Sequence, residues 1–436
     1  MNGKKTMSVL LAGAMAAGML AGCGSSSKSG TSSGSTSGSS TKLSMMLSGT
    51  ESDSFVEGYR KIIDEFNKSN EYGVTIEPEF LSTSDYKTKL ATMMASDAEP
   101  DIIFTYELGY LGNFVDGNKI VDLQKYFDDD KDWADSFNDG TLDQLTYNGD
   151  IYGVPTAQCM AVMYYNKQIF KDNGIEVPTT YDEYLDACKK LKSAGVTPVA
   201  LAATSDDAWL VSQYIQQLSD GLAGSAVFDG LRDGTGKWND ESFVKAAKMF
   251  QSEIDAGNFE DGFTGVGGDE ARALFQNGQT AMYFNGTWEV STLDDSNATS
   301  VAGNIGCFEF PASDSQYQGV NVGALDNSFA ITKNCKNVDA AVAFLKYWTS
   351  AENEENLLYN YGKMPSVSIN VDTSKVSDLG QDVLNCFSET TDMTAWFDRM
   401  DTDLGNEFNN KGIAIANGDD PQKTYDDLES YAESKS

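Results

Sequence analysis

The chain has 436 residues and a formal net charge of −35, and 40% of its residues are hydrophobic. A chain of this length usually divides into two domains, and this hydrophobic content is ample for globular packing. The strong negative charge repels phosphate backbones, so nucleic acid is not an expected partner. Because the sequence contains no histidine, it also excludes Ser-His and Cys-His nucleophile systems and His-containing zinc sites.

The six cysteines do not point to a metal or redox centre. None of them shows the Cys-x-x-Cys spacing, so neither a zinc knuckle nor a thioredoxin-type site is predicted. Besides Cys23, an odd number remains, which cannot all pair: Cys159, Cys188, Cys307, Cys335 and Cys386. We interpret these five mainly as small buried residues, with one disulfide left open. No metal site and no cofactor is expected.

The N-terminal segment has the build of a secretory signal. Residues 1–22 contain Lys4 and Lys5, followed by an apolar run over residues 7–20 and then by small residues. That run is too short for an ordinary membrane-spanning helix. We therefore predict that residues 1–22 are a cleaved signal peptide.

Cys23 ends the tetrapeptide LAGC of residues 20–23, which resembles the bacterial lipobox. The resemblance implies that the Cys23 thiol receives a diacylglyceryl group and becomes the mature N-terminus; the alternative is an ordinary cleaved signal with an incidental cysteine. Two or more acyl chains hold a protein stably on a bilayer. Residues 25–41 are almost entirely Ser, Gly and Thr, which predicts a flexible tether. Residues 23–41 are thus the predicted lipidated cysteine and linker, and the folded part starts near Lys42.

Strands and helices then alternate along the first part of the predicted mature chain. Apolar runs and period-two alternation predict strands over residues 43–47, 74–80 and 100–104, and helical spacing of apolar residues predicts helices over residues 55–66 and 86–94. Such alternation is typical of an α/β fold with a mainly parallel sheet. Three polar residues follow the ends of these strands, at the sheet edge where ligands usually bind: Glu51, Tyr106 and Glu107.

The middle of the chain begins with residues 151–155, IYGVP, which lead into an apolar strand over residues 156–166. Gln158 lies just past the start of this strand. Farther along, Thr180 is predicted to cap a helix, with Glu183 completing a capping box. These two residues are expected to be structural.

Two tryptophans follow predicted strand ends. Trp209 comes after a strand over residues 197–202. Residues 275–290, FQNGQTAMYFNGTWEV, contain a buried strand over residues 280–284 that ends at an Asn-Gly pair, and Trp288 follows it. A large aromatic side chain at a strand end suits a ligand edge, although a core tryptophan behind the strand is the alternative.

The last part of the chain returns toward the first. The predicted elements are strands over residues 307–311, 320–325 and 326–331, a helix over residues 338–348, and a terminal helix-rich region after residue 393. Four candidate site residues occur here, two at a strand start and two before the terminal helices: Asp326, Asn327, Trp396 and Arg399.

Four segments in this order resemble one family. They are the lipobox, IYGVP followed by YYNKQIF, FQNGQTAMYFNGTW, and the YGKMPS of residues 361–366. Together they resemble the maltose-binding-like, sugar-type solute-binding proteins of ABC importers, and the resemblance runs from about Lys42 to the C-terminus. It implies a two-lobed periplasmic-binding-protein-like α/β fold, with each lobe a mainly parallel sheet flanked by helices and the ligand cleft between the lobes. Lobe 1 is expected to comprise residues 42–155 plus about 325–365, and lobe 2 residues 156–324 plus about 366–436.

The same resemblance implies a function and partners. The protein is expected to be a monomeric lipoprotein, anchored in the cell membrane on the extracytoplasmic face. It is expected to capture a sugar by hinge closure and deliver it to the transmembrane subunits of the permease. The resemblance implies binding and not catalysis, so no enzymatic activity is expected.

Sugars present apolar C–H faces and a rim of hydroxyls, so aromatic rings, carboxylates and amides should form their site. The aromatic candidates are Trp209, Trp288 and Trp396, and the polar candidates are Glu51, Tyr106, Glu107, Gln158, Asp326, Asn327 and Arg399. The ligand-binding role that the resemblance implies transfers best to Trp288 and next to Gln158. The remaining candidates could have structural roles instead: Glu51 could cap a helix, and Arg399 could form an ion pair with Asp398 or Asp401. Trp133, Trp238 and Trp348 are interpreted as packing residues, and the several cleft aromatics favour an oligosaccharide.

Three alternatives remain on sequence alone. A surface glycosidase would use two of the 66 acidic residues, roughly 5–10 Å apart. The same fold also binds other solutes, such as ferric iron or polyamines. The adjacent Tyr164 and Tyr165 are only weak evidence for an iron site, because neighbouring side chains on a strand point to opposite faces of the sheet. A sensor that presents sugar to a signalling protein cannot be separated from an importer component at this stage.

Overall fold

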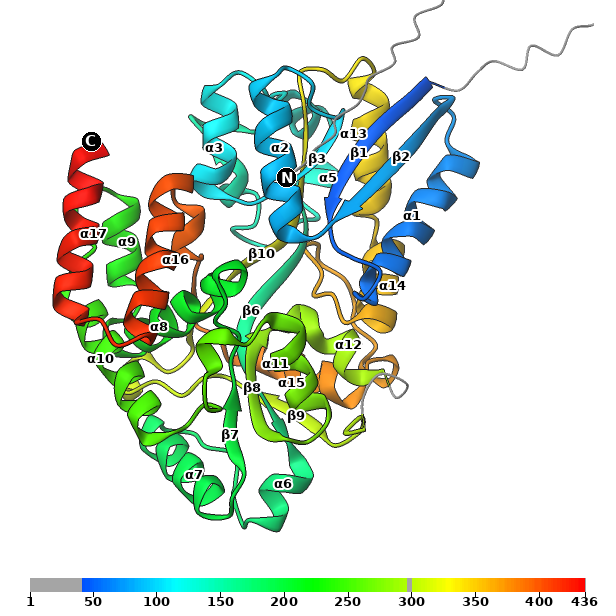
Figure 1. The fold of residues 1–436 in the computed structure, drawn as a ribbon. Helices are drawn as coiled ribbons and strands as arrows, with labels where there is room; N and C mark the ends of the chain where they lie inside the picture. Colours follow the sequence, from blue (N-terminus) through cyan, green and yellow to red (C-terminus); the bar gives the residue numbers. More distant parts are fainter. Residues whose placement is uncertain (1–40, 296–299, 436) are drawn as a thin grey trace, which may run out of the picture. The chain divides into compact units, whose positions relative to one another are not determined.

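Two long antiparallel strands join the two parts of the main sheet in the computed structural model, which describes residues 41–295 and 300–435 (Figure 1). They are β6 (Val154–Asn166) and β10 (Val320–Ile331). Each of these strands spans two successive segments that the sequence analysis treated separately: β6 joins the end of residues 151–155 to residues 156–166, and β10 joins residues 320–325 to residues 326–331. The predicted signal peptide, Cys23 and nearly all of the linker lie outside the described residues.

One part of the sheet pairs with the end of β10. Its order is β2-β1-β3-β10, with parallel pairing among the first three strands and an antiparallel step from β3 to β10. The strands are β1 (Thr41–Ser48), β2 (Val74–Leu81) and β3 (Ile102–Thr105). The accompanying helices are α1 (Phe55–Ser69), α2 (Thr83–Ala95), α3 (Leu108–Asp116), α4 (Gln124–Asp129), α5 (Lys131–Ala134), α13 (Val338–Trp348) and α14 (Ala351–Tyr361). A short hairpin, β4 (Thr146–Tyr147) and β5 (Asp150–Ile151), precedes β6.

The other part of the sheet is built on the end of β6. There β8 (Thr280–Gly286) and β9 (Ile305–Phe308) pair with β6 in antiparallel fashion, and β7 (Thr197–Ala200) pairs with β8 in parallel. The start of β10 pairs in parallel with β11 (Asp392–Thr394). The accompanying helices are α6 (Lys167–Asp172), α7 (Tyr181–Ser193), α8 (Ala208–Ala223), α9 (Ala226–Arg232), α10 (Glu241–Ala256), α11 (Gly268–Gln276), α12 (Val290–Asp294), α15 (Asp378–Glu389), α16 (Thr402–Ala416) and α17 (Pro421–Lys435).

Two hydrophobic cores stabilise these parts. The first draws its side chains from residues 43–154 and 325–367, and the second draws its side chains from residues 159–324 and 358–428. Helices that are far apart in sequence therefore pack together, as α1 and α13 do through Phe66 and Phe344, whose ring centroids are 5.0 Å apart (Figure 1). Three tryptophans interpreted as packing residues are buried in these cores: Trp133, Trp238 and Trp348.

Local capping was predicted with mixed success. Thr180 caps α7 as predicted, because its hydroxyl accepts a hydrogen bond from the Glu183 N–H at 3.2 Å. The suggestion that Glu51 caps α1 is wrong. The helix begins after Ser54 without a side-chain cap, and the exposed Glu51 carboxylate instead contacts Arg60 at 2.5 Å.

The cysteines between residues 159 and 386 are all buried free thiols. The sulfur atoms of Cys307 and Cys386 lie 4.0 Å apart and are not bonded. Among the described residues, no helix combines the length and the apolar character needed to cross a membrane.

Candidate ligand-binding site

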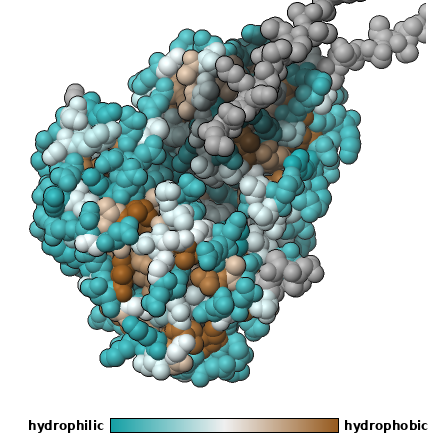
Figure 2. All heavy atoms as spheres, viewed as in Figure 1, coloured by the Kyte–Doolittle hydropathy of each residue, from teal (hydrophilic) through white to brown (hydrophobic). Residues whose placement is uncertain are grey.

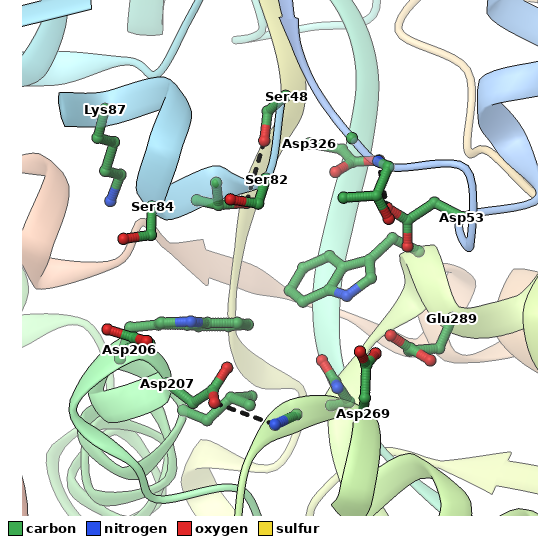
Figure 3. Close-up of a pocket in the computed structure, with 18 of the residues that line it drawn as sticks. Ser48, Asp53, Ser82, Ser84, Lys87, Asp206, Asp207, Asp269, Glu289 and Asp326 are labelled. Atoms are coloured by element: carbon green, nitrogen blue, oxygen red, sulfur yellow. Dashed lines mark hydrogen bonds between the residues drawn. The ribbon is translucent and has the colours of Figure 1, made fainter. Parts of the chain in front are cut away.

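A pocket of about 710 Å³ collects residues from both parts of the sheet. Loops after β1, β2 and β3 contribute to one side, and the segments before α8, before α11 and after β8 contribute to the other (Figure 3). The bulged middle of β10 also lines the pocket, together with Lys363, Trp396, Asp398 and Arg399. Strand ends and helix starts therefore supply most of the site, as the edge rule for α/β sheets predicts.

Three indoles form the aromatic wall of the pocket, defined here as Trp209, Trp288 and Trp396. The ring centroids of Trp209 and Trp288 are 5.8 Å apart, and those of Trp288 and Trp396 are 6.1 Å apart. Trp288 is thus the middle ring of the row. Its indole folds back over Gly286, where an added Cβ would lie only 2.1 Å from the ring. The Asn-Gly pair before Trp288 therefore does more than end the strand, because only glycine leaves room for this ring position.

A second group of lining residues is the hydroxyl wall, defined here as Ser48, Thr50, Ser82 and Ser84, which lie at the end of β1, after it, and at the start of α2. Ser48 and Thr83 share a hydrogen bond of 3.0 Å, and Thr50 donates to Asp53 through both its N–H and its hydroxyl. Figure 3 shows Ser48, Ser82 and Ser84 across the pocket from Asp206 and Asp207. A ligand in this pocket would meet aromatic faces and hydroxyl groups together.

Arg399 lines the pocket beside Trp396 and forms a buried ion pair. Its Nη1 donates to Glu107 Oε1 at 2.6 Å and to the Leu325 carbonyl at 2.9 Å. The guanidinium also lies 4.6 Å from the centre of the Tyr106 ring and 4.0 Å from that of Trp396. Burial raises the pKa of Glu107, and the positive charge of Arg399 opposes that rise. The Glu107–Arg399 pair therefore positions the guanidinium against the rings of Tyr106 and Trp396.

A second ion pair supports the base of the pocket. Arg272, on α11, donates from Nε and Nη2 to the two oxygens of Glu289 at 2.6 and 2.9 Å. Its Nη1 also donates to Asp269 at 2.9 Å. Such a bidentate pair fixes orientation as well as distance. Because Glu289 directly follows Trp288, the pair ties α11 to the segment that carries the middle indole.

The β10 bulge places Asp326 in the pocket. The pairing register of β10 shifts between Leu325 and Asn327. Asp326 accepts a hydrogen bond from the ammonium of Lys363 at 2.6 Å, and that ammonium lies 3.8 Å from the centre of the Phe55 ring. Asn327 is held from behind by the Tyr59 hydroxyl.

The structure brings most of the sequence-predicted site residues together. Those that line the pocket are Trp209, Trp288, Trp396, Tyr106, Asp326, Asn327 and Arg399. Glu51, Gln158 and Glu107 do not line it. Glu51 points to Arg60 at the surface, and the Gln158 side chain accepts from Asn138 Nδ2 at 3.0 Å. Glu107 lies behind the lining as the partner of Arg399, which corrects the suggested pairing of Arg399 with Asp398 or Asp401.

Several lining residues were missed by sequence reasoning. The edge rule that selected Glu51 would also have found Ser82, which directly follows β2, and Ser84 in the first turn of α2. Arg272 and Glu289 carried no such signal, because their bidentate contact depends on how α11 packs beside the end of β8. Lys363 lies within the YGKMPS segment, but nothing in that segment indicated that it reaches Asp326.

Comparison with known proteins agrees with this geometry. The profile of the family described as "Bacterial extracellular solute-binding protein" matches residues 52–355. The multiple sugar-binding protein of Streptococcus mutans is 26% identical over 310 residues, which are 67% of this chain and 68% of that protein. The arabinooligosaccharide-binding protein of Bacillus subtilis is 25% identical over 280 residues, which are 62% of this chain and 60% of that protein.

Solved structures show the same fold. A structure from work on xylan utilization by the thermophilic bacterium Caldanaerobius polysaccharolyticus superimposes with a TM-score of 0.82 at 28% identity, covering 89% of this chain and 99% of the other. A chitin oligosaccharide binding protein superimposes with a TM-score of 0.84 at 23% identity, covering 91% and 99%. The two-lobed α/β fold predicted from the sequence is confirmed. The expectation of a mainly parallel sheet in each lobe holds for β1, β2 and β3 but is wrong for the other part, where β8 and β9 pair with β6 in antiparallel fashion. The chain belongs to the bacterial extracellular solute-binding proteins.

Proposed function

We propose that this protein is the substrate-binding component of an ABC importer and that it captures a carbohydrate in the described pocket. The observation that carries the proposal is the row of three indoles facing hydroxyl and carboxylate groups. Indole faces provide stacking area for the apolar C–H faces of sugar rings, and the polar groups can bind their hydroxyls. Relatives named for sugar and oligosaccharide binding support this proposal.

The spacing of the indoles favours an oligosaccharide. Trp209 and Trp288 are partly exposed and their ring centroids lie 5.8 Å apart, so these two rings can contact successive sugar units. The buried Trp396 supports Trp288 from behind, with the two ring centroids 6.1 Å apart. A single sugar ring would leave part of the aromatic wall uncovered. The pocket volume of about 710 Å³ is also large for one such ring.

Closure of the pocket would couple binding to transport. We assign residues 42–155 and about 325–365 to one lobe, and residues 156–324 and about 366–436 to the other. The two cores, each drawn from two stretches of chain, support this division. The ligand contacts both walls only when they approach each other, so it shifts the population toward the closed form that a permease would recognise.

The N-terminal segment would hold the protein near its permease. The lipobox-like residues 20–23 support lipidation of Cys23, and the Ser-rich and Gly-rich residues after it support a tether. The protein would then work as a monomer on the extracytoplasmic face of the membrane. The extracellular character of the family supports this location.

A thermal-shift screen of a soluble form starting at Lys42 tests the proposed ligand class. The probes are mono- and oligosaccharides, amino acids, polyamines and ferric citrate. A ligand at about 100 times its dissociation constant stabilises the native state by about 2.7 kcal/mol, which such a screen detects. We expect a shift with one oligosaccharide series, its loss in Trp288→Ala, and partial retention in Trp288→Phe, which keeps an aromatic face. A shift only with a metal or an amine would overturn the carbohydrate proposal and leave the fold unchanged.

A further inference from the structure

The cations that line the pocket are largely neutralised by the protein itself. Arg272 pairs with Glu289 and Asp269, Arg399 pairs with Glu107, and Lys363 pairs with Asp326. Lys87 is the remaining lining cation. Within residues 41–295 and 300–435 its ammonium has no carboxylate partner, and it lies 5.0 Å from the centre of the Tyr106 ring.

The lining carboxylates are not neutralised in the same way. Five of them form no ion pair with a lysine or arginine of the described chain: Asp53, Asp206, Asp207, Glu270 and Asp398. Some accept hydrogen bonds from neutral groups instead. Asp207, for example, accepts from the Thr204 hydroxyl at 2.6 Å and from the Gly268 N–H at 3.0 Å. Neutral donors orient a carboxylate but do not cancel its charge.

These carboxylates lie on more than one side of the pocket. Figure 3 shows Asp53 and Asp326 near one end of the site and Asp206, Asp207 and Asp269 along the opposite wall. A ligand between the walls would therefore meet negative charge from both directions. The wider surface adds to this field, because the chain carries a formal charge of −35 and hydrophilic residues cover much of the face seen in Figure 2.

We infer that the pocket holds a locally negative potential and selects uncharged or cationic sugars against acidic ones, such as glycans that carry uronate groups. An acidic ligand would place its carboxylate among five unneutralised carboxylates with one free ammonium to receive it. Like-charge placement of this kind is a common way in which a binding site rejects a close analogue. The statement about sugars rests on the proposed function, whereas the statement about the potential does not.

Tryptophan fluorescence can measure the potential without any ligand. All six tryptophans lie in the described part of the chain, and only Trp209 and Trp288 are not buried. Emission that a soluble quencher can reach therefore comes from the aromatic wall. At fixed ionic strength we expect iodide to quench less, and caesium more, than neutral acrylamide does. Equal quenching by iodide and caesium, corrected for their intrinsic efficiencies, would overturn the inference.

Matched variants separate the pocket from the rest of the surface. Asp206→Asn and Glu270→Gln each remove one exposed lining charge and should increase quenching by iodide, whereas Lys87→Met should decrease it. Asp64→Asn removes the same charge from an exposed position on α1 that does not line the pocket, and it should have little effect because salt screens distant charges. An equal effect of Asp64→Asn and Asp206→Asn would assign the potential to the whole surface and contradict the inference.

A matched pair of glycans then tests selection. The probes are an oligosaccharide that binds in the thermal-shift screen, its derivative oxidised to a uronate at one primary hydroxyl, and the uncharged methyl amide of that uronate. We expect the uronate to bind at least about tenfold more weakly than the amide, with the gap narrowing at high salt and in Asp206→Asn. Equal or tighter binding of the uronate would overturn the selection. If no glycan binds but the quenching asymmetry is present, the carbohydrate proposal fails and the inference about potential stands.

Discussion

The aromatic wall and the hydroxyl wall face the same pocket but are supported in different ways. The segment around Trp396 is fixed by a buried polar network on α8. Gln216 donates to the Ala395 carbonyl at 2.9 Å and accepts from the Phe397 N–H at 3.2 Å, so it holds the backbone on both sides of the indole. Asp220, one helical turn along α8, accepts a hydrogen bond from Thr394. The indole is therefore positioned by the core of its lobe.

The hydroxyl wall is supported by short, exposed contacts. Ser48 bonds to Thr83, and Ser82 donates to Asp85 at 2.9 Å. These side chains are small and lie at loop ends and at a helix start, so their removal disturbs little packing. Substitutions that disturb the aromatic wall should therefore lower both stability and ligand affinity. Substitutions in the hydroxyl wall should lower ligand affinity alone.

The largest effect should come from breaking the buried pair beside the aromatic wall. Glu107→Gln leaves Arg399 as an unpaired buried cation, which typically costs ~3–5 kcal/mol of unfolding free energy. We expect chemical denaturation to show this loss together with weaker ligand binding. Glu51→Gln, which breaks the exposed pair with Arg60, is the control and should change neither. A Glu107→Gln protein as stable as the wild type would contradict this role for the pair.

A pH-dependent effect should follow from Asp220. Burial raises the pKa of the Asp220 carboxyl from 3.8 to about 8, so between these values the folded state binds one more proton than the unfolded state. This contribution to stability is therefore lost as pH rises, by about 1.4 kcal/mol per pH unit within that window. Asp220→Asn does not titrate, so its Tm relative to the wild type should increase between about pH 4 and pH 8. A difference in Tm that is the same at every pH would exclude this assignment.

Removal of the middle indole should cost most of the affinity for sugar. Stacked tryptophans at binding sites typically contribute 2 kcal/mol or more, roughly thirtyfold in Kd. Isothermal titration of Trp288→Ala with the oligosaccharide found in the screen measures this loss. Trp209→Ala should lose less, because Trp209 is a terminal ring of the row. Unchanged affinity in Trp288→Ala would remove the aromatic wall from the binding site.

A smaller effect is expected from Gln216→Ala, which removes the support of the Trp396 segment on α8. It leaves the Ala395 carbonyl and the Phe397 N–H without their partner, at a cost of about 1–3 kcal/mol in stability, and it frees the Trp396 segment to shift. Gln217→Ala is the matched control on the same helix, because Gln217 bonds to the backbone of Val320 and Val322. Both variants should lose stability, but only Gln216→Ala should also lose several-fold in ligand affinity. Equal affinity losses in both would refute a specific role for Gln216 in positioning Trp396.

The smallest effect should come from the hydroxyl wall. Ser84→Ala removes one exposed hydroxyl that lines the pocket and should weaken sugar binding by about 1 kcal/mol. Its Tm should stay at the wild-type value, since the Ser84 side chain is exposed. A clear fall in Tm with unchanged affinity would reverse the contrast between the walls.

The candidate site was predictable only where a local rule applied. Trp288 follows the end of an apolar strand, and Tyr106 follows another, so the edge rule placed both correctly in the pocket. The same rule selected Glu51 and Glu107, which lie beside pocket residues along the chain but point elsewhere. Backbone position was therefore predicted better than side-chain direction, because direction depends on contacts with distant segments.

The sequence by itself determined the secondary structure and several local contacts. The strands and helices follow from the periodicity of apolar residues, α7 starts where Thr180 can cap it, and Gly286 allows the Trp288 ring to fold back. Each of these features depends on interactions within a few residues of chain. They were enough to indicate the α/β class and the family.

The tertiary structure alone decided which charges neutralise one another and which face the ligand. Glu107 and Arg399 are 292 residues apart in sequence, and Lys363 meets Asp326 across 37 residues. No local pattern specifies such partners, because an ion pair forms only after the sheet and its helices have brought the two segments together. The negative charge of the pocket comes from the lining carboxylates that form no ion pair. These carboxylates could be identified only from the folded structure of the described residues.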